Sequence, residues 1–345
     1  MPDATGARTR LSVPAADGLL LFTALIWGVG FVAQRIAARD MGDTPFTFNA
    51  ARFAVGTLCL VPMLIGRRGA FSFPSIAGGI AAGLAMAIAS SLQQAAMSTV
   101  TAGTAGFITG TYVIWVPIIG IVLGQRAGAR VWIGAACALA GLWILGTPPA
   151  PDVAAMSDAA AAGGTALTGA AGAASATDLS RWIPVHLSRG ELLVLGCAVA
   201  WAFHVHVIGW AAHRADAFGV SFVQFACTTA ASATFSIALE EPTLEMLHAG
   251  MWPIIFSGVF AIAIAFTLQV VAQGVAPPAH AAIILSLESV FAEMSGTLFL
   301  NEGFDRQKWI GAGLMFAGAL IATVTGLRPA PCQPEPPSPP RPESG

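Results

Sequence analysis

The chain has 345 residues, of which 56% are hydrophobic and only 10% are charged, and its formal net charge is −2. This number of charged side chains is too small to cover the surface of a soluble globule of this length. The composition therefore excludes an ordinary soluble protein and indicates a membrane protein. The near-neutral charge gives no reason to expect nucleic acid as a partner.

Ten stretches of the chain are long and apolar enough to cross a bilayer, which takes about 20 residues of helix. They cover residues 18–37, 46–65, 75–96, 101–123, 131–146, 191–211, 218–239, 250–272, 280–300 and 308–326. Their apolar character is continuous and does not alternate, which favours helices over barrel strands. The predicted fold is an all-α integral membrane protein with ten transmembrane helices.

The predicted domain organisation places five helices on each side of a central linker. It comprises a cytoplasmic N-terminal tail (1–17), a first five-helix repeat (18–146), a low-complexity linker (147–190), a second five-helix repeat (191–326) and a Pro-rich disordered tail (327–345). The linker is rich in Ala, Gly, Ser and Thr and is expected to be mobile, with a short amphipathic turn over 179–187 left open. The polar first 17 residues are unlike a cleavable signal peptide.

The two halves of the chain resemble each other in sequence. ALIWGVGF at 24–31 recurs as AVAWAFHV at 198–205, SLQQAAM at 91–97 as TLQVVAQ at 267–273, and WIGAACALAG at 132–141 as WIGAGLMFAG at 309–318. The offsets of 174, 176 and 177 drift so little that they indicate one duplicated unit. An odd number of spans in each half makes the second copy enter from the opposite side, so two inverted repeats are predicted.

The basic residues predict the orientation in the membrane. With the N-terminus inside, nine arginines fall on the cytoplasmic side: Arg8, Arg10, Arg67, Arg68, Arg126, Arg130, Arg214, Arg328 and Arg341. The other side then holds five basic residues: Arg39, Arg181, Arg189, Arg306 and Lys308. Since cytoplasmic loops carry more Lys and Arg, both termini are expected in the cytoplasm, with the protein in the cell (inner) membrane.

Ionisable side chains inside the spans are candidates for function, because hydrocarbon tolerates them only beside water or a partner. Glu288 and Glu293 in the ninth span bracket the midplane but lie about 140° apart around the helix, so they cannot act as a carboxylate pair. Each is interpreted as a cation or proton site in a central cavity, or alternatively as a contact between helices. Arg52 lies at a depth similar to that of Glu293, which suggests an Arg52–Glu293 ion pair; the alternative is that Arg52 snorkels to the interface.

Amide, imidazole and aromatic side chains complete the set of candidates. The amides are Gln93, Gln94, Gln269 and Gln273, which bind a substrate or join helices. His204 is a candidate pH-responsive group, one helical turn from Trp201, or else a hydrogen-bond donor to a neighbouring helix. Thr111, Tyr112, Trp115 and Trp27 are candidates for an apolar pocket, with ordinary packing as the alternative.

These motifs resemble the EamA-type transporters of the drug/metabolite transporter superfamily. The resemblance rests on WGVGFVAQR in the first span, NAARF in the second, and SLESVFAEMSGTLFLNE at 286–302 followed by WIGAGLMFAGALI. It implies a secondary transporter of small polar metabolites, amino acids or drugs, commonly moving them outward, with Glu288 and Glu302 where the family carries glutamates. Family members usually have proline after the first of these glutamates, where this chain has Ser289.

Two inverted bundles suggest alternating access to a site at the midplane. Spans 1, 3, 4, 6, 8 and 9 are expected to line the cavity, and Glu288 is the hypothesised site of proton coupling. The expected partners are a small-molecule substrate and the lipid bilayer, with a homodimer left open.

The alternative function is an intramembrane lipid-modifying or hydrolytic enzyme using Glu288 or His204. The chain lacks a Gly-rich phosphate loop, HExxH and GxSxG, so the common enzyme motifs give this alternative no support. The five cysteines show no CxxC spacing, so neither a metal site nor a cofactor is expected.

Overall fold

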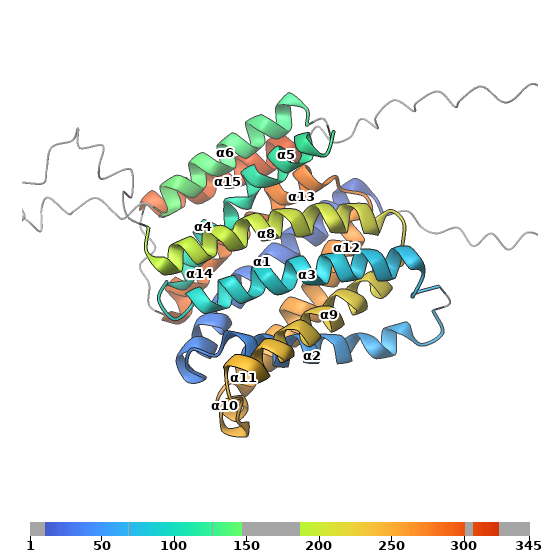
Figure 1. Cartoon of the computed structure of the whole chain (residues 1–345). Coiled ribbons are helices and arrows are strands. Elements are labelled where there is room, and N and C mark those ends of the chain that lie inside the picture. The colour runs from blue at the N-terminus through green and yellow to red at the C-terminus, as the bar shows by residue number, and fades with distance from the viewer. Residues whose placement is uncertain (1–10, 68, 126, 147–186, 301–305, 324–345) are drawn as a thin grey trace, which may run out of the picture.

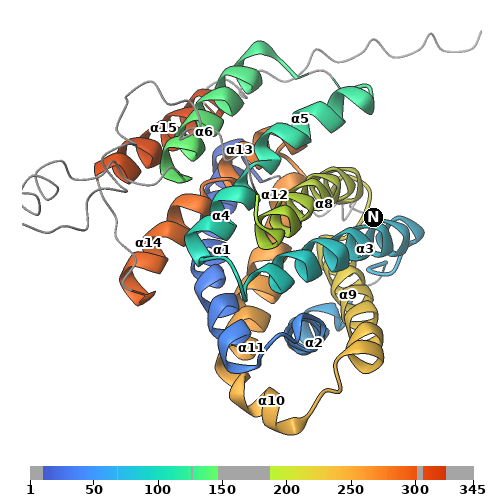
Figure 2. The ribbon, with the colours of Figure 1, turned by 60° about the vertical axis from the view of Figure 1, so that its left-hand side comes forward.

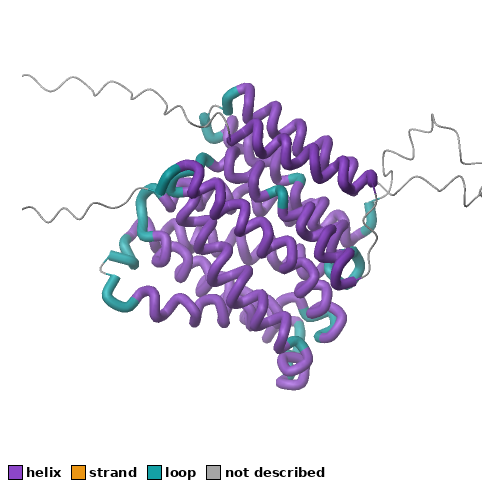
Figure 3. The backbone as a smooth tube through the Cα atoms, turned by 180° about the vertical axis from the view of Figure 1, so that it is seen from behind, coloured by secondary structure: helices purple, strands orange, loops and turns teal. Residues whose placement is uncertain are grey.

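A computed structural model describes residues 11–67, 69–125, 127–146, 187–300 and 306–323. Within these ranges the chain is helical, and no strand occurs among them (Figure 3). The elements are α1 (Val13–Asp40), α2 (Pro45–Leu64), α3 (Phe73–Ala96), α4 (Ala102–Gly110), α5 (Tyr112–Val122), α6 (Ala129–Gly146), α8 (Arg189–Ala212), α9 (Ala217–Leu239), α10 (Leu244–Ala249), α11 (Met251–Phe256), the π-helix η4 (Ser257–Phe266), α12 (Thr267–Gln273), α13 (Pro278–Leu285), α14 (Glu288–Leu300) and α15 (Arg306–Thr323).

Within the described residues, eight helical stretches are long and apolar enough to cross a membrane, which indicates a multi-pass membrane protein. They are Val13–Asp40, Pro45–Leu64, Phe73–Ala96, Ala102–Val122, Arg189–Ala212, Ala217–Leu239, Met251–Gln273 and Pro278–Leu300. Helices α6 and α15 occupy the fifth and tenth predicted ranges but do not meet the same criterion. The apolar part of α6 is shorter, and α15 begins with Arg306, Gln307 and Lys308, which lower its hydropathy.

The first helix starts at Val13, five residues before the predicted span, because its local sequence caps it there. The Ser12 hydroxyl accepts a hydrogen bond from the Ala15 amide, and proline stands in the first turn. The predicted tail 1–17 is therefore partly helical, and residues 1–10 lie outside the described part of the chain. Most of the predicted linker, the suggested turn at 179–187 except its last residue, and the C-terminal tail also lie outside it.

Two of the predicted continuous spans are in fact broken near their middle. The fourth span divides into α4 and α5 at Thr111, and the ninth divides into α13 and α14 at Ser286 and Leu287. At each break a hydroxyl donates to the carbonyl three residues earlier: Thr111 to Ile108 at 2.6 Å and Ser286 to Ile283 at 2.8 Å. These local bonds give a backbone carbonyl a partner at each break, and the apolar composition of the two spans does not reveal the breaks.

The eighth span contains a wider π-helical segment between α11 and α12. Two carbonyl oxygens of η4 also accept bonds from side chains of α1: Trp27 Nε1 donates to Ala261 O at 3.1 Å, and Thr23 Oγ1 donates to Ala265 O at 3.3 Å. π-helical turns occur frequently at functional sites. The segment joins α1 to the second half of the chain.

Glycines allow α6 and α15 to pack closely and antiparallel, along one edge of the molecule (Figures 1 and 2). A Cβ atom added at Gly134 would lie 2.9 Å from Gly318 O, and one added at Gly141 would lie 2.5 Å from Gly311 O. Only glycine therefore lets these two backbones approach so closely, as is common between helices in membranes.

Helices α2 and α9 also pack antiparallel, and polar contacts close both ends of this pair. The Glu240 carboxylate, just after α9, accepts bonds from the Phe46 and Thr47 amides at 2.8 and 2.7 Å, at the start of α2. At the other end, Arg67 forms an ion pair with Asp216 at 3.1 Å. The other helices cross between the halves: α3 packs on α8 and α9, whereas η4 packs on α1 and α2.

Candidate functional site

A central cavity lies where the two halves meet, and the space not filled by atoms there, including the part open to solvent, is about 640 Å³. Its lining comes from both halves: Trp27, Gly30, Phe31, Gln34, Arg52, Phe53, Gln93, Thr109 and Tyr112 from the first, and Trp201, His204, Val205, Ser257, Ala261, Ile262, Phe266, Gln269, Leu285 and Glu288 from the second. Spans 1, 3, 4, 6, 8 and 9 contribute as predicted, and span 2 contributes as well through Arg52 and Phe53.

Aromatic rings form the middle of the cavity. The ring of Phe266 lies 4.5 Å from Trp27 and 5.4 Å from Trp201, measured between centroids, and it stacks on Trp201. The Trp201 indole N–H donates to Gln93 Oε1 at 3.3 Å, and the Trp27 indole bonds to η4. Hydrogen bonds thus hold both indoles in place, and the ring of Phe266 packs against both of them.

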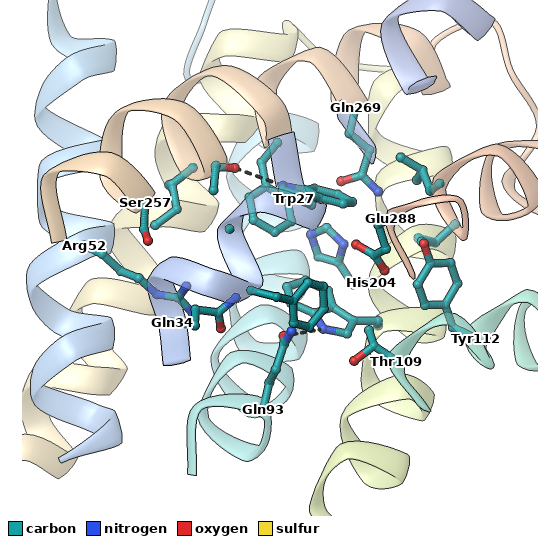
Figure 4. A pocket seen from close by; sticks show the side chains of 18 of the residues that line it. Trp27, Gln34, Arg52, Gln93, Thr109, Tyr112, His204, Ser257, Gln269 and Glu288 are labelled. Carbon is teal, nitrogen blue, oxygen red and sulfur yellow. Dashed lines mark hydrogen bonds between the residues drawn. The ribbon is translucent and has the colours of Figure 1, made fainter. Parts of the chain in front are cut away.

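Glu288 stands at one end of this aromatic group, beside Tyr112, Thr109 and Gln269 (Figure 4). It is the first residue of α14, directly after the break in the ninth span, and only 4% of its surface is exposed. Gln269 Oε1 is buried and has no hydrogen-bond partner among the described residues. This end of the cavity presents oxygen acceptors and a carboxylate.

Arg52 stands at the other end, near Gln34 and Ser257 (Figure 4). It is 5% exposed, its Nε donates to Asn49 Oδ1 at 2.9 Å, and its guanidinium lies 4.9 Å from the centroid of the Phe48 ring. Arg52 therefore does not snorkel to the interface. It is held inside the protein by an amide and aromatic faces.

The predicted Arg52–Glu293 ion pair is wrong. Glu293 pairs instead with Lys308 of α15, and its carboxylate lies over Gly103 of α4, where an added Cβ would overlap it. Similar depth in the membrane did not bring the two side chains together, because Glu293 faces α4 and α15 and not the cavity. Glu293 thus forms a contact between helices, which is the alternative interpretation that its position in the sequence left open.

The four glutamines divide into two kinds. Gln93 and Gln269 line the cavity, whereas Gln94 and Gln273 join helices through backbone carbonyls. Gln94 Nε2 donates to Gln34 O at 3.1 Å, and Gln273 Nε2 donates to Val205 O at 3.0 Å. Gln94 and Gln273 therefore join helices, whereas Gln93 and Gln269 are placed where a substrate could contact them.

His204 reaches the cavity and His206 does not. The Nε2 atom of His204 lies 3.0 Å from Gln224 Oε1, and its ring lies 5.3 Å from that of Trp201. His206 Nε2 instead lies 2.7 Å from Val116 O. Among the remaining candidates, Trp115 packs in an apolar cluster outside the cavity lining.

Thr111, the last of these candidates, also lies outside the lining, at the break between α4 and α5. Several lining residues were missed by sequence reasoning, above all Gln34, Phe53, Thr109, Ser257 and Phe266. Helical spacing could have pointed to one of them, because Thr109 lies three residues, about one helical turn, before the candidate Tyr112. Ser257 and Phe266 belong to the π-helical segment, which the apolar pattern of the eighth span does not mark.

Comparison with known proteins agrees with this arrangement. The profile of the EamA-like transporter family matches the chain twice, over residues 15–147 and 188–324. A protein of Archaeoglobus fulgidus named "uncharacterized transporter" is 26% identical over 310 residues, covering 90% of this chain and 86% of that protein. A solved crystal structure with 19% identity superposes with a TM-score of 0.66 over 91% of this chain and 98% of that chain, which shows a shared fold. The chain belongs to the EamA-like transporter family.

Proposed function

We propose that this protein is a secondary active transporter that exports small polar metabolites, amino acids or drugs by alternating access. The observation that carries the proposal is the central cavity, which both halves build and which holds a buried carboxylate and a buried guanidinium. Intramembrane charges are expensive unless they serve a substrate, an ion or a partner. The family match supports a transporter over the intramembrane enzyme.

Alternating access needs two related bundles, and the glycine contacts support an inverted pair. With the offset of 177, Gly134 is equivalent to Gly311, and Gly141 is equivalent to Gly318. In the structure Gly134 meets Gly318 and Gly141 meets Gly311, so each contact turns into the other when the halves are exchanged. Because α6 and α15 are antiparallel, the exchange also reverses direction, as expected of ten spans in two inverted repeats.

The breaks in the helices support a site at the midplane. The fourth and ninth spans hold equivalent places in the two halves, and both are interrupted beside the cavity. Broken helices in corresponding positions of two repeats are a strong indication of where a transporter binds its substrate. Short segments on either side of a break also give the two bundles places to bend.

Proton coupling through Glu288 completes the proposed mechanism. The carboxylate is buried at the break of the ninth span, and the aromatic centre of the cavity separates it from Arg52 (Figure 4). A carboxylate there binds a proton or an ammonium group more readily than it remains charged and alone. We place both termini in the cytoplasm and the protein in the inner membrane, as the distribution of basic residues suggests.

A counterflow assay tests the proposal. Proteoliposomes loaded with one unlabelled amino acid, metabolite or drug at a time are given a trace of the same labelled compound outside. A carrier accumulates the label transiently, whereas an enzyme changes the compound chemically. If no member of a broad panel shows counterflow and one of them is chemically converted, the enzyme is the correct function.

A further inference from the structure

We infer that the cavity binds a dipolar substrate with its two charges far apart, an anionic group at Arg52 and a cationic group at Glu288. The inference rests on the proposed transport function and names the class of solute that the site would carry. Such a solute has an apolar stretch between a carboxylate-like end and an ammonium-like end.

The Arg52 end offers donors and lacks an acid. Its Nε is occupied by Asn49, which leaves the two terminal nitrogens of the guanidinium for a ligand. No carboxylate lies within ion-pair distance of Arg52 in the described ranges of the chain. Two further polar groups, Asn49 Nδ2 and the Ser257 hydroxyl, are buried and unpaired in the same part of the structure. A guanidinium with two free donors fits a carboxylate or another planar anion in bidentate geometry.

The Glu288 end has the opposite chemistry. The carboxylate faces the cavity beside the Gln269 side-chain oxygen, which is buried and unpaired among the residues described. Thr109 Oγ1 is a further buried oxygen at this end without a partner there. A primary ammonium has three donors and no acceptor, and this end of the cavity offers three oxygen groups that can accept from it.

The distance between the ends excludes a compact zwitterion that contacts both. The cavity follows α1 from Trp27 to Gln34, which are seven residues or about 10 Å apart along the helix axis. Arg52 lies beside Gln34, and Glu288 lies past Trp27 at the other end (Figure 4). In an α-amino acid the ammonium and carboxylate groups are attached to the same carbon, so the molecule reaches only one of the two side chains.

The middle of the cavity suits an apolar chain. Trp27, Trp201 and Phe266 form its wall. The indole nitrogens of the two tryptophans already donate hydrogen bonds to the protein. Removing Arg52 or Glu288 from water without a partner is costly, and a ligand with one charge would leave the other end uncompensated. One solute that carries both charges neutralises the two ends together, whereas an anionic solute at Arg52 would need a proton on Glu288 as well.

The test uses four small probes on the purified full chain, with binding followed by thermal stabilisation and by tryptophan fluorescence. The probes are 6-aminohexanoate, its isomer norleucine, hexanoate and hexylamine. The first two share composition and net charge and differ only in where the charges stand. We expect 6-aminohexanoate to bind about tenfold more tightly than each of the others, which corresponds to about 1.4 kcal/mol.

Variants then assign each end. Arg52→Gln should weaken the binding of 6-aminohexanoate and hexanoate about tenfold and leave that of hexylamine unchanged. Glu288→Gln should weaken the binding of 6-aminohexanoate and hexylamine about tenfold and leave that of hexanoate unchanged. Arg52→Lys should recover part of the anion binding. Matched controls are Arg67→Gln, whose side chain pairs with Asp216 outside the cavity, and Glu245→Gln on the exposed surface of α10, both of which should bind all probes as the natural chain does.

Some outcomes overturn the inference and leave the proposed function intact. If norleucine binds as tightly as 6-aminohexanoate, or if Arg52→Gln folds normally and binds hexanoate unchanged, the dipolar site is refuted even when counterflow of another solute is observed. The reverse is also decisive. Selective binding of 6-aminohexanoate without counterflow would support the site and reject transport.

Discussion

Tyr112 and Glu288 occupy equivalent positions in the two halves of the chain, and each begins the helix that follows a break. The offset between them is 176, the same as between Gln93 and Gln269, which both line the cavity. Tyr112 and Glu288 lie side by side in the cavity (Figure 4). A duplicated break has therefore placed a phenol in one half and a carboxylate in the other, so that only one half carries an acid there.

Glu288→Gln is expected to remove the pH dependence of transport. The amide keeps the size and the hydrogen-bonding capacity of the side chain but cannot take up a proton, so uptake should vary little with pH between about 5 and 8. The measurement is counterflow in proteoliposomes over this range. Glu245→Gln is the control and should behave as the natural chain does, and a normal pH profile in Glu288→Gln would exclude this residue as the coupling site.

Glu293 and Lys308 are expected to stabilise the packing of α14 against α15 without affecting ligand binding. The side chains are 10% and 16% exposed, so removing either partner should lower the free energy of unfolding by about 2 kcal/mol. In a double-mutant cycle of Glu293→Gln and Lys308→Met, a coupling of about 1 kcal/mol is expected in thermal or denaturant unfolding. The effects of Arg52→Gln and Glu293→Gln on the free energy of unfolding should be additive. A coupling of about 1 kcal/mol between them would mean that these two side chains do form an ion pair, contrary to the structure.

Gly311→Ala is expected to force α6 and α15 apart. The new methyl group would lie 2.6 Å from Gly141 O and 2.8 Å from Leu145 N, and these are backbone atoms that cannot rotate away. The overpacking should cost about 1–3 kcal/mol in unfolding free energy. Gly313→Ala, two residues along the same helix with no atom within 4 Å, is the matched control and should be neutral or slightly stabilising. Equal stability of the two variants would show that α6 and α15 do not pack as closely at Gly311 as the structure has them.

Both tails are expected on the same side of the membrane. A variant that keeps Cys332 and replaces the four cysteines of the helices reports on the C-terminal tail, and adding Gly6→Cys to a chain without Cys332 reports on the other. An impermeant thiol reagent applied to intact cells should leave both unlabelled until the membrane is opened. Labelling of one tail only would rule out ten spans in two inverted repeats.

The sequence predicted the helical spans well, because crossing a bilayer imposes a length and an apolar composition that can be read residue by residue. Each of the ten predicted ranges contains a helix or a series of helices, and eight of these helical stretches in the described residues are long and apolar enough to cross a membrane. The breaks at Thr111 and Ser286 and the widened turns of η4 were missed, since a change in the backbone hydrogen-bond pattern leaves the hydropathy of a span unchanged.

The candidate site could be predicted only in part. The repeat and the intramembrane charges pointed to Glu288, Arg52 and the glutamines, and seven of the twelve candidates line the cavity. Depth along a helix follows from residue number, but the side of the helix that meets a given neighbour depends on packing between helices. This is why Glu293 was assigned to Arg52, when it faces Gly103 and pairs with Lys308, a residue that the sequence placed at the outer end of the tenth span.

The π-helical turns of the eighth span have no counterpart in the third, where α3 is an uninterrupted α-helix. Exchanging the conformations of the two halves therefore does not reproduce the same molecule. In the proposed alternating-access cycle, the state open to one side is therefore not a mirrored copy of the state open to the other, and the two need not have equal free energy. The resting orientation of the empty protein would then be set by the chain itself as well as by a solute or an ion gradient.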